Sequence, residues 1–238
     1  ICRVQDKFYS KTIRFYDINY QLAQNEDKNT IFENWCDFLN YFDSTIHFQL
    51  SFINQHSNMA EYEKVIHINP QEDEFDDLRM EFAQMLNNQL AKGNNGLMRT
   101  KYITFGIEAE NIREARPKLE RIESDIMNNF QILGVTAYPL NGTERLQIMY
   151  ETFNQDSKVP FHFSYDEVLR TGLSTKDYIA PTSFVFKNGK DFQMGGTIGA
   201  VSYLQILAPE LTDKMLAEFL DMDRNLMVNF HIQSIDQM

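Results

Sequence analysis

The sequence is short of cysteine, of positive charge and of long apolar runs, and each shortage excludes a class of protein. Cys2 and Cys36 are the only cysteines in 238 residues, which fits neither a disulfide framework nor a metal-ligand spacing and favours a reducing, cytosolic setting. Lys and Arg number 22 against 34 Asp and Glu, and the net charge of -12 would repel nucleic-acid phosphates from most of the surface, although a local basic patch stays open. No apolar run approaches the roughly 20 residues of a membrane helix, and no signal peptide is recognisable, so no transmembrane segment is expected.

Catalytic and metal-binding patterns are missing as well. Three serines lack the Gly-x-Ser-x-Gly setting of a hydrolase nucleophile: Ser164, Ser183 and Ser202. The five histidines show no HExxH or His-x3-His spacing: His47, His56, His67, His162 and His231. We therefore predict no catalytic, cofactor-binding or metal residue, and no cofactor, for this chain.

One dense acidic cluster, at residues 71–77, allows two interpretations. Its carboxylates could converge on a metal or form an acid–base pair, which requires a shared pocket. They could also form the solvated start of a helix, where negative side chains face the positive end of the helix dipole. The second interpretation accounts for the cluster without a ligand and is favoured.

The glycine-rich run at 184–200 raises the question of a phosphate loop. A Walker loop needs Gly-Lys-Ser/Thr after its first glycine, but Gly199 is followed by Ala200, Val201 and Ser202. Just upstream, Asn188-Gly189 between two apolar segments is a hairpin signal, and both residues tolerate the positive φ of a type I′ turn. We predict structural turns here and no nucleotide site.

Four segments alternate apolar and polar residues with the period of a half-buried strand. They lie at residues 16–22, 46–52, 103–107 and 226–232. A shorter strand is expected at residues 135–138.

Helical apolar spacing predicts four further elements. The strongest runs through Ala115, Leu119, Ile122, Ile126, Phe130 and Leu133, and Pro117 places the start of this helix near 113–116. An earlier helix opens on a Thr30–Glu33 capping box and carries Trp35, Leu39 and Phe42 on one stripe. The third stripe is Phe75, Leu78, Phe82, Met85 and Leu86, ending before a C-cap at Gly93; the fourth, capped by Thr212 or Asp213, is Met215, Leu216, Phe219 and Leu220. One more helix is expected after Asn141-Gly142-Thr143.

Helices inserted singly among alternating strands indicate an α+β fold, with mixed or antiparallel sheets covered by packed helices. The order is compatible with split βαβ units related to ferredoxin-like folds. The polar stretch 154–160 divides the chain into an N-terminal α+β subdomain, 1–153, and a hairpin, helix and strand subdomain, 160–238. The abundant aromatic residues are expected in the core, because a base-stacking platform would need a basic groove.

Arg113, Arg116, Lys118 and Arg121, with Lys101, form the main cationic grouping. Acidic neighbours neutralise it through pairs such as Glu114–Lys118 one helical turn apart, so no direct nucleic-acid binding is expected.

Two stretches together resemble a known family. Residues 102–109 lead into 112–119, and 180–184 continue through the glycine run and 207–209 to 226–232. In order and spacing they resemble the N-terminal region of conjugative-transfer ATPases of the CagE/TrbE/VirB type, especially the TraE-like proteins of Gram-positive conjugative elements. The resemblance covers essentially the whole chain, but its motifs are diffuse structural patterns and match no catalytic position.

This resemblance implies a non-catalytic docking and assembly domain of a type IV secretion ATPase, at the inner face of the cell membrane. Its expected partners are other secretion-channel proteins and copies of itself. ATP and Mg²⁺ would bind in a C-terminal motor domain that would follow residue 238, since the chain starts without Met and stops after a strand. The alternatives are a free-standing ferredoxin-like ligand-binding or regulatory domain and, last, a hydrolase with a carboxylate pair.

Overall fold

The computed structural model describes residues 1–18, 20, 24–56, 73, 75–92, 97–157, 159–205 and 213–234. Its main sheet has six strands in the order β1-β2-β4-β3-β9, with β5 also paired to β2, and every pairing is antiparallel. The strands are β1 (Cys2–Gln5), β2 (Phe8–Phe15), β3 (His47–His56), β4 (Leu97–Glu108), β5 (Ala137–Pro139) and β9 (Leu226–Ile232). The predicted α+β class, with antiparallel strands and packed helices, is confirmed.

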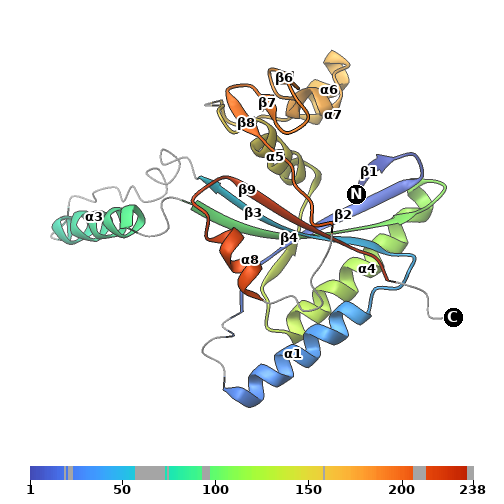
Figure 1. The fold of residues 1–238 in the computed structure, drawn as a ribbon, viewed down its shortest axis with the longest axis horizontal. Coiled ribbons are helices and arrows are strands. Elements are labelled where there is room, and N and C mark those ends of the chain that lie inside the picture. Colours follow the sequence, from blue (N-terminus) through green and yellow to red (C-terminus); the bar gives the residue numbers. More distant parts are fainter. Residues whose placement is uncertain are drawn as a thin grey trace.

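Two long helices cover one face of this sheet (Figure 1). They are α1 (Asn25–Asn40) and α4 (Ile112–Ile132). The predicted stripe of α4 is buried from Ala115 to Phe130, and it packs against the odd-numbered apolar residues of β2 and β4. Asn111 caps the helix by accepting from the backbone N–H groups of Arg113 and Glu114, so α4 begins one residue before the predicted range.

The start of α1 differs from the prediction. The helix begins at Asn25, so Thr30 lies inside it, and the Thr30 hydroxyl donates to the carbonyl of Glu26 instead of capping. The capping box at Thr30 is therefore wrong, because earlier residues already satisfy the helical geometry. The apolar stripe is correct: Trp35 and Leu39 pack on the core, and Phe42 just beyond the helix is buried.

Strand predictions succeeded in the centre of the sheet and failed at the N-terminal end. The segments 46–52, 103–107 and 226–232 lie in β3, β4 and β9, and the short strand near 135–138 is β5. The segment predicted at 16–22 is wrong, because the strand is β2, at Phe8–Phe15, and Tyr16 to Ile18 are not in a strand. Residues 19 and 21–23 lie outside the described part.

The connections within the sheet follow a simple order. Four strands and two helices run β2, α1, β3, β4, α4, β5 along the chain, and these strands lie side by side as β5-β2-β4-β3. That spatial order is the one expected for two interleaved split βαβ units. The ferredoxin-like assignment itself stays a prediction.

The opposite side of the sheet carries α5 (Gly142–Phe153) and, above it, a small unit that we call the hairpin module, residues 159–205 (Figure 1). The module contains α6 (Tyr165–Thr171), α7 (Thr175–Ile179) and a three-stranded sheet of β6 (Phe184–Val185), β7 (Phe192–Met194) and β8 (Thr197–Gly199). α5 begins at the predicted place with an Asn141–Glu144 capping box.

After the module, α8 (Asp213–Leu220) leads into β9, which pairs with β3. The two predicted subdomains, 1–153 and 160–238, thus share the main sheet. The helix predicted at Thr212 or Asp213 is α8, although Thr212 and the side chains of Met215 and Leu216 lie outside the described part. Its stripe was expected to face inward, which is wrong for Phe219, because that side chain is exposed.

The predicted hairpin at Asn188-Gly189 joins β6 to β7, but its turn type is wrong. Positive φ among described glycines occurs at Gly134, Gly172 and Gly195, so the Asn188-Gly189 pair does not form a type I′ turn. The Asn188 side chain instead accepts from the backbone N–H groups of Lys190 and Asp191, and this longer loop needs no left-handed residue.

Candidate docking surfaces

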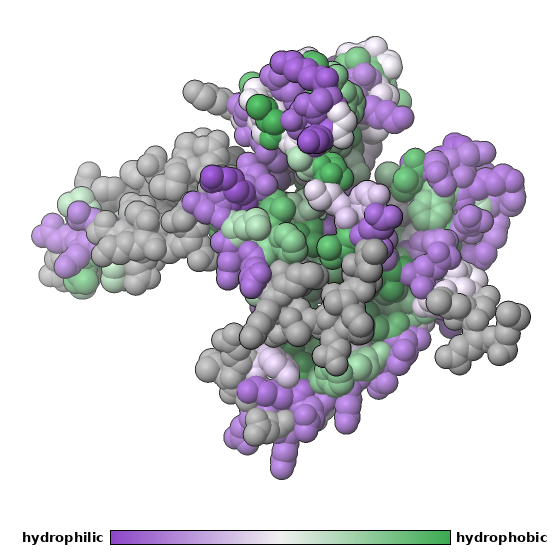
Figure 2. Space-filling model, in the orientation of Figure 1, coloured by the Kyte–Doolittle hydropathy of each residue, from purple (hydrophilic) through white to green (hydrophobic). Residues whose placement is uncertain are grey.

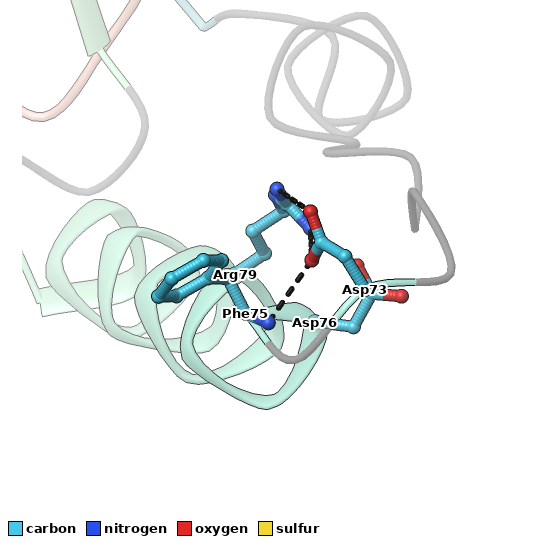
Figure 3. Close-up of polar contacts among 4 residues, drawn as sticks. All are labelled: Asp73, Phe75, Asp76 and Arg79. Carbon is cyan, nitrogen blue, oxygen red and sulfur yellow. Dashed lines mark hydrogen bonds and ion pairs between the residues drawn. The ribbon is translucent and has the colours of Figure 1, made fainter.

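The first candidate surface is on α3 (Asp76–Lys92), which is inserted between β3 and β4 and stands away from the sheet (Figure 1). Its beginning is fixed locally, by residues of the predicted acidic cluster (Figure 3). Asp73 accepts from the backbone N–H of Phe75 at 3.0 Å and binds the Arg79 guanidinium through both carboxylate oxygens, at 2.5 and 2.8 Å. Asp76 also contacts Arg79, at 2.6 Å.

These contacts explain the electrostatics of the helix start. The Arg79 guanidinium lowers the pKa of the Asp73 carboxyl, and the two aspartates raise the pKa of Arg79. The interpretation of the cluster as a solvated helix start is thus supported for Asp73, Asp76 and Asp77, while residues 71, 72 and 74 lie outside the described part. A side-chain turn from Asp73 to the Phe75 N–H and a forked ion pair with Arg79 stabilise the start of the helix without help from a core.

The apolar stripe of α3 is exposed to solvent. The exposed fractions are 53% for Phe75, 65% for Leu78, 50% for Phe82 and 47% for Met85. The expectation that aromatic residues lie in the core is wrong for Phe75 and Phe82, because the helix lies beyond the reach of the core formed by α1, α4 and the sheet. The side chain of Leu86 and the C-cap at Gly93 lie outside the described part.

The spacing of the exposed residues is informative. Phe75, Leu78, Phe82 and Met85 follow one another at intervals of three, four and three, which is the seam of a helix that packs on one other helix. Met80, 63% exposed, lies on the opposite side of α3. The seam is therefore a narrow, directional apolar surface.

The hairpin module is the second candidate surface. No residue of 159–205, all of which the structure describes, is buried. Apolar residues show among polar ones at the surface of the module, at the top of the space-filling view (Figure 2). Several of its large apolar side chains are mostly exposed: Val159, Leu169, Phe186, Ile198, Val201, Tyr203 and Leu204. Its aromatic rings pack in small clusters, such as Phe184 with Phe186 and Phe192, in place of one core. A unit of this size without buried residues gains little stability of its own, which favours a surface covered in an assembly.

Sequence reasoning missed this second surface, because we expected aromatic residues to fall in the core. A usable signal was present. The apolar residues around Phe186 and Val201 stand in segments too short for a helix or strand period and are interrupted by glycine turns, so they have no element with which to bury themselves.

The glycine run forms the turn between β7 and β8, and a carboxylate occupies it. Gly195 has φ of +55°. The backbone N–H of Gly196 donates to the Asp156 carboxylate at 2.6 Å. A Cβ at Gly195 or Gly196 would stand 2.9 or 2.8 Å from the same oxygen, so the close approach requires glycine. The run is a structural turn that holds the end of α5 to the module.

The remaining predicted groups do not converge. Lys118 pairs with Glu114 at 2.8 Å, as predicted, and Lys101 pairs with Asp17. His47 lies against the ring of Phe8, and His162 is 3.9 Å from Glu167 in the module. Within the described part of the chain, no three His, Cys, Asp or Glu side chains gather in a metal-binding arrangement.

Comparison with known proteins identifies no family for this chain. No family model and no curated protein matches the chain. Among the described residues, none of the helices has the length and apolarity that crossing a bilayer demands. The features that bear on function are the two exposed surfaces and the family resemblance of the sequence.

Proposed function

We propose that this chain is a non-catalytic docking and assembly domain of a conjugative-transfer ATPase that acts in type IV secretion. In this proposal it works at the cytoplasmic face of the membrane and couples a separate motor domain to the channel. The family resemblance suggests the system, and the surfaces of the domain suggest the docking role. We also assign the central β2, α1, β3, β4, α4, β5 unit to the ferredoxin-like folds, on the strand order β5-β2-β4-β3.

The exposed seam of α3 carries this proposal. Phe75, Leu78 and Phe82 are each at least half exposed, although burial of such a side chain is worth about 1.5–3 kcal/mol. A channel protein could bind this seam through one amphipathic helix, because apolar residues at intervals of three, four and three pack against a single facing helix. The Asp73–Phe75 turn and the Asp73–Arg79 ion pair hold the start of the helix in place, which lowers the ordering cost of binding.

The module agrees with a non-catalytic role at the one place where a phosphate loop was considered. The Asp156 carboxylate fills the Gly195–Gly196 turn, and its negative charge would oppose a phosphate there. In this proposal, nucleotide binding and hydrolysis belong to the motor domain of the full-length protein.

A matched pair of α3 variants tests the docking role. Leu78→Asp places a charge in the seam, and Met80→Asp places the same charge two residues away on the opposite face, at nearly equal exposure, 65% and 63%. In donor cells that carry the full-length parent gene, Leu78→Asp is expected to lower the frequency of conjugative transfer about tenfold or more, as for loss of an interface anchor. Met80→Asp should leave the frequency of transfer close to that of the unsubstituted protein.

The controls separate docking from folding. Both purified variants should keep the melting temperature of the parent chain, because neither side chain belongs to the core. Unchanged transfer in Leu78→Asp would remove the seam from the proposal. An equal decrease in both variants would mean that exposed charge on α3, and not the seam, matters.

A further inference from the structure

The two edges of the main sheet are built differently. At one edge, β1 carries Arg3 and an irregular register between Arg3 and Gln5, and β5 is three residues long and ends at Pro139. A charge, an irregularity, a short strand and a proline are the features by which proteins keep sheet edges from pairing with another chain. This edge is protected.

The opposite edge, β9, has none of these features. Its seven residues, Leu226–Ile232, contain no Lys, Arg, Asp, Glu or Pro, although a quarter of the whole chain, 24%, is charged. The register with β3 runs without a break from Asn54↔Leu226 to Phe48↔Ile232. Within the described part of the chain, no strand pairs with the outer side of β9. Its outward backbone N–H and C=O groups therefore form a regular row with which no described strand is paired.

The strand is also held firmly in place. The Asn229 side chain accepts from Gln49 at 2.8 Å and from Ser51 at 2.7 Å, which fixes the register of β9 on β3. Just before the strand, Asp221 pairs with Arg99 at 2.9 Å, and just after it, the Ser234 hydroxyl donates to the Phe42 carbonyl. A preformed strand loses little conformational entropy when another strand pairs with it.

The side chains of β9 match those of a second β9 that runs antiparallel. If a two-fold axis passes beside Asn229, Val228 lies opposite Phe230 of the second copy, and Leu226 lies opposite Ile232 of the second copy. These four residues are on the face of α1 and α4, and each is half-buried in a single copy, so pairing covers apolar surface on both sides. On the other face, exposed Met227 lies opposite His231 of the second copy, and no like charges meet.

From this self-complementarity we infer that β9 is a homodimer edge, at which two copies of this chain join their main sheets by antiparallel β9–β9 pairing. The pairing does not depend on the proposed secretion role. It leaves the α3 seam free, because α3 is inserted at the end of the β3–β4 hairpin and not at the outer side of β9 (Figure 1).

Charge-pattern variants of the full chain test this assignment by sedimentation velocity over a concentration series. Met227→Lys with His231→Lys puts like charges opposite each other at both ends of the pair and should weaken dimerisation about tenfold or more. Met227→Glu with His231→Glu should do the same. Mixing these two variants should restore dimers as mixed pairs. Within one copy, positions 227 and 231 are roughly 13 Å apart along the strand, beyond the Debye length, so each variant is tolerable as a monomer.

A matched control has opposite charges. Met227→Lys with His231→Glu puts Lys opposite Glu in the dimer and should dimerise like the parent. A parent chain that stays monomeric at every concentration would overturn the inference, and so would lysine variants that dimerise normally or a mixture that stays monomeric.

A second measurement needs no substitution. In the parent chain, amide exchange in β9 should slow as concentration rises, because the outward N–H groups become paired. Exchange in α3 should not change, since α3 lies outside the contact. Slowing confined to α3, or no concentration dependence in β9, would place any self-association elsewhere and reject the β9 edge.

Discussion

Phe130→Ala is the most direct test of how the α4 face packs on the sheet. Phe130 is fully buried and joins three elements of the core. Its ring stacks on Phe15 of β2 at a centroid distance of 5.2 Å and lies 5.1 Å from Phe38 of α1. Truncation to alanine thus removes contacts from the strand and from both helices at once.

The size of the effect follows from two losses. The first is the transfer free energy of the ring, and the second is the cavity left where the neighbouring aromatic side chains cannot collapse, which together cost about 3–5 kcal/mol for Phe→Ala. The two lost ring contacts, with Phe15 and Phe38, place the expected loss in the upper half of this range, since each aromatic pair adds about 0.5–1.5 kcal/mol beyond area burial.

Urea titration followed by circular dichroism measures the free energy of unfolding of the variant and the parent. Ile132→Ala is the control on the same helix, because Ile132 is 67% exposed and should lose less than about 0.5 kcal/mol. A loss below about 1 kcal/mol for Phe130→Ala would contradict the packing of α4, because a fully buried ring cannot be removed so cheaply. An equal loss in both variants would mean that burial of the Phe130 ring does not set the loss, and helix propensity could not explain it, because alanine is the better helix former at both positions.

Three further outcomes are expected. Burial of Tyr41 and its hydrogen bond to Asp125 raise the pKa of the Tyr41 hydroxyl to about 12. The contribution of this group to folding stability is therefore present below pH 10 and should be lost as pH rises toward 12. Tyr41→Phe should lack this pH dependence, and absorbance titration of the phenolate checks the pKa. Asp156→Ala should speed exchange of the Gly196 amide with little change in the global melting temperature, because the carboxylate holds a local turn; unchanged exchange would contradict the contact at 2.6 Å. Isothermal titration of the chain with ATP and Mg²⁺ should show no micromolar binding, and saturable heat in that range would sink the non-nucleotide assignment.

The sequence predicted best the elements that bury one continuous apolar face. Residues 115–133 form a stripe with one apolar face, and 46–52 alternate strictly, so the period alone shows which side is buried. Each of these elements can bury only one face in the core, and the structure buries that face.

β2 was missed because a charged residue interrupts its apolar face. Tyr9 and Ile13 face α4, while Ser10 and Thr12 are buried on the other face, where Thr12 shares a hydrogen bond with Thr104 at 2.9 Å. Lys11, between Tyr9 and Ile13, breaks the apolar alternation of the α4 face, where it pairs with Glu123 of α4 at 2.7 Å. The segment 16–22 shows the period better, yet past Phe15 the pairing of β2 with β4 ends.

The α3 surface could not be predicted because periodicity describes a helix and not what covers it. Phe75 and Phe82 have the same spacing that buries Leu119 and Ile126 in α4. The difference arises from topology. α3 is inserted in the connection between β3 and β4, and α1 and α4 already cover the apolar face of the sheet.

The two inferred contacts would reinforce each other. A dimer joined through β9 presents two α3 seams in one assembly, so a partner array that offers two binding helices would hold both. The second contact then forms at an effective concentration that can raise apparent affinity by about 10²–10⁴ without new contacts. Loss of β9 pairing should therefore weaken binding to an immobilised array of partner helices far more than binding to one such helix in solution. Equal weakening in both formats would mean that β9 acts on the seam itself and not through valency.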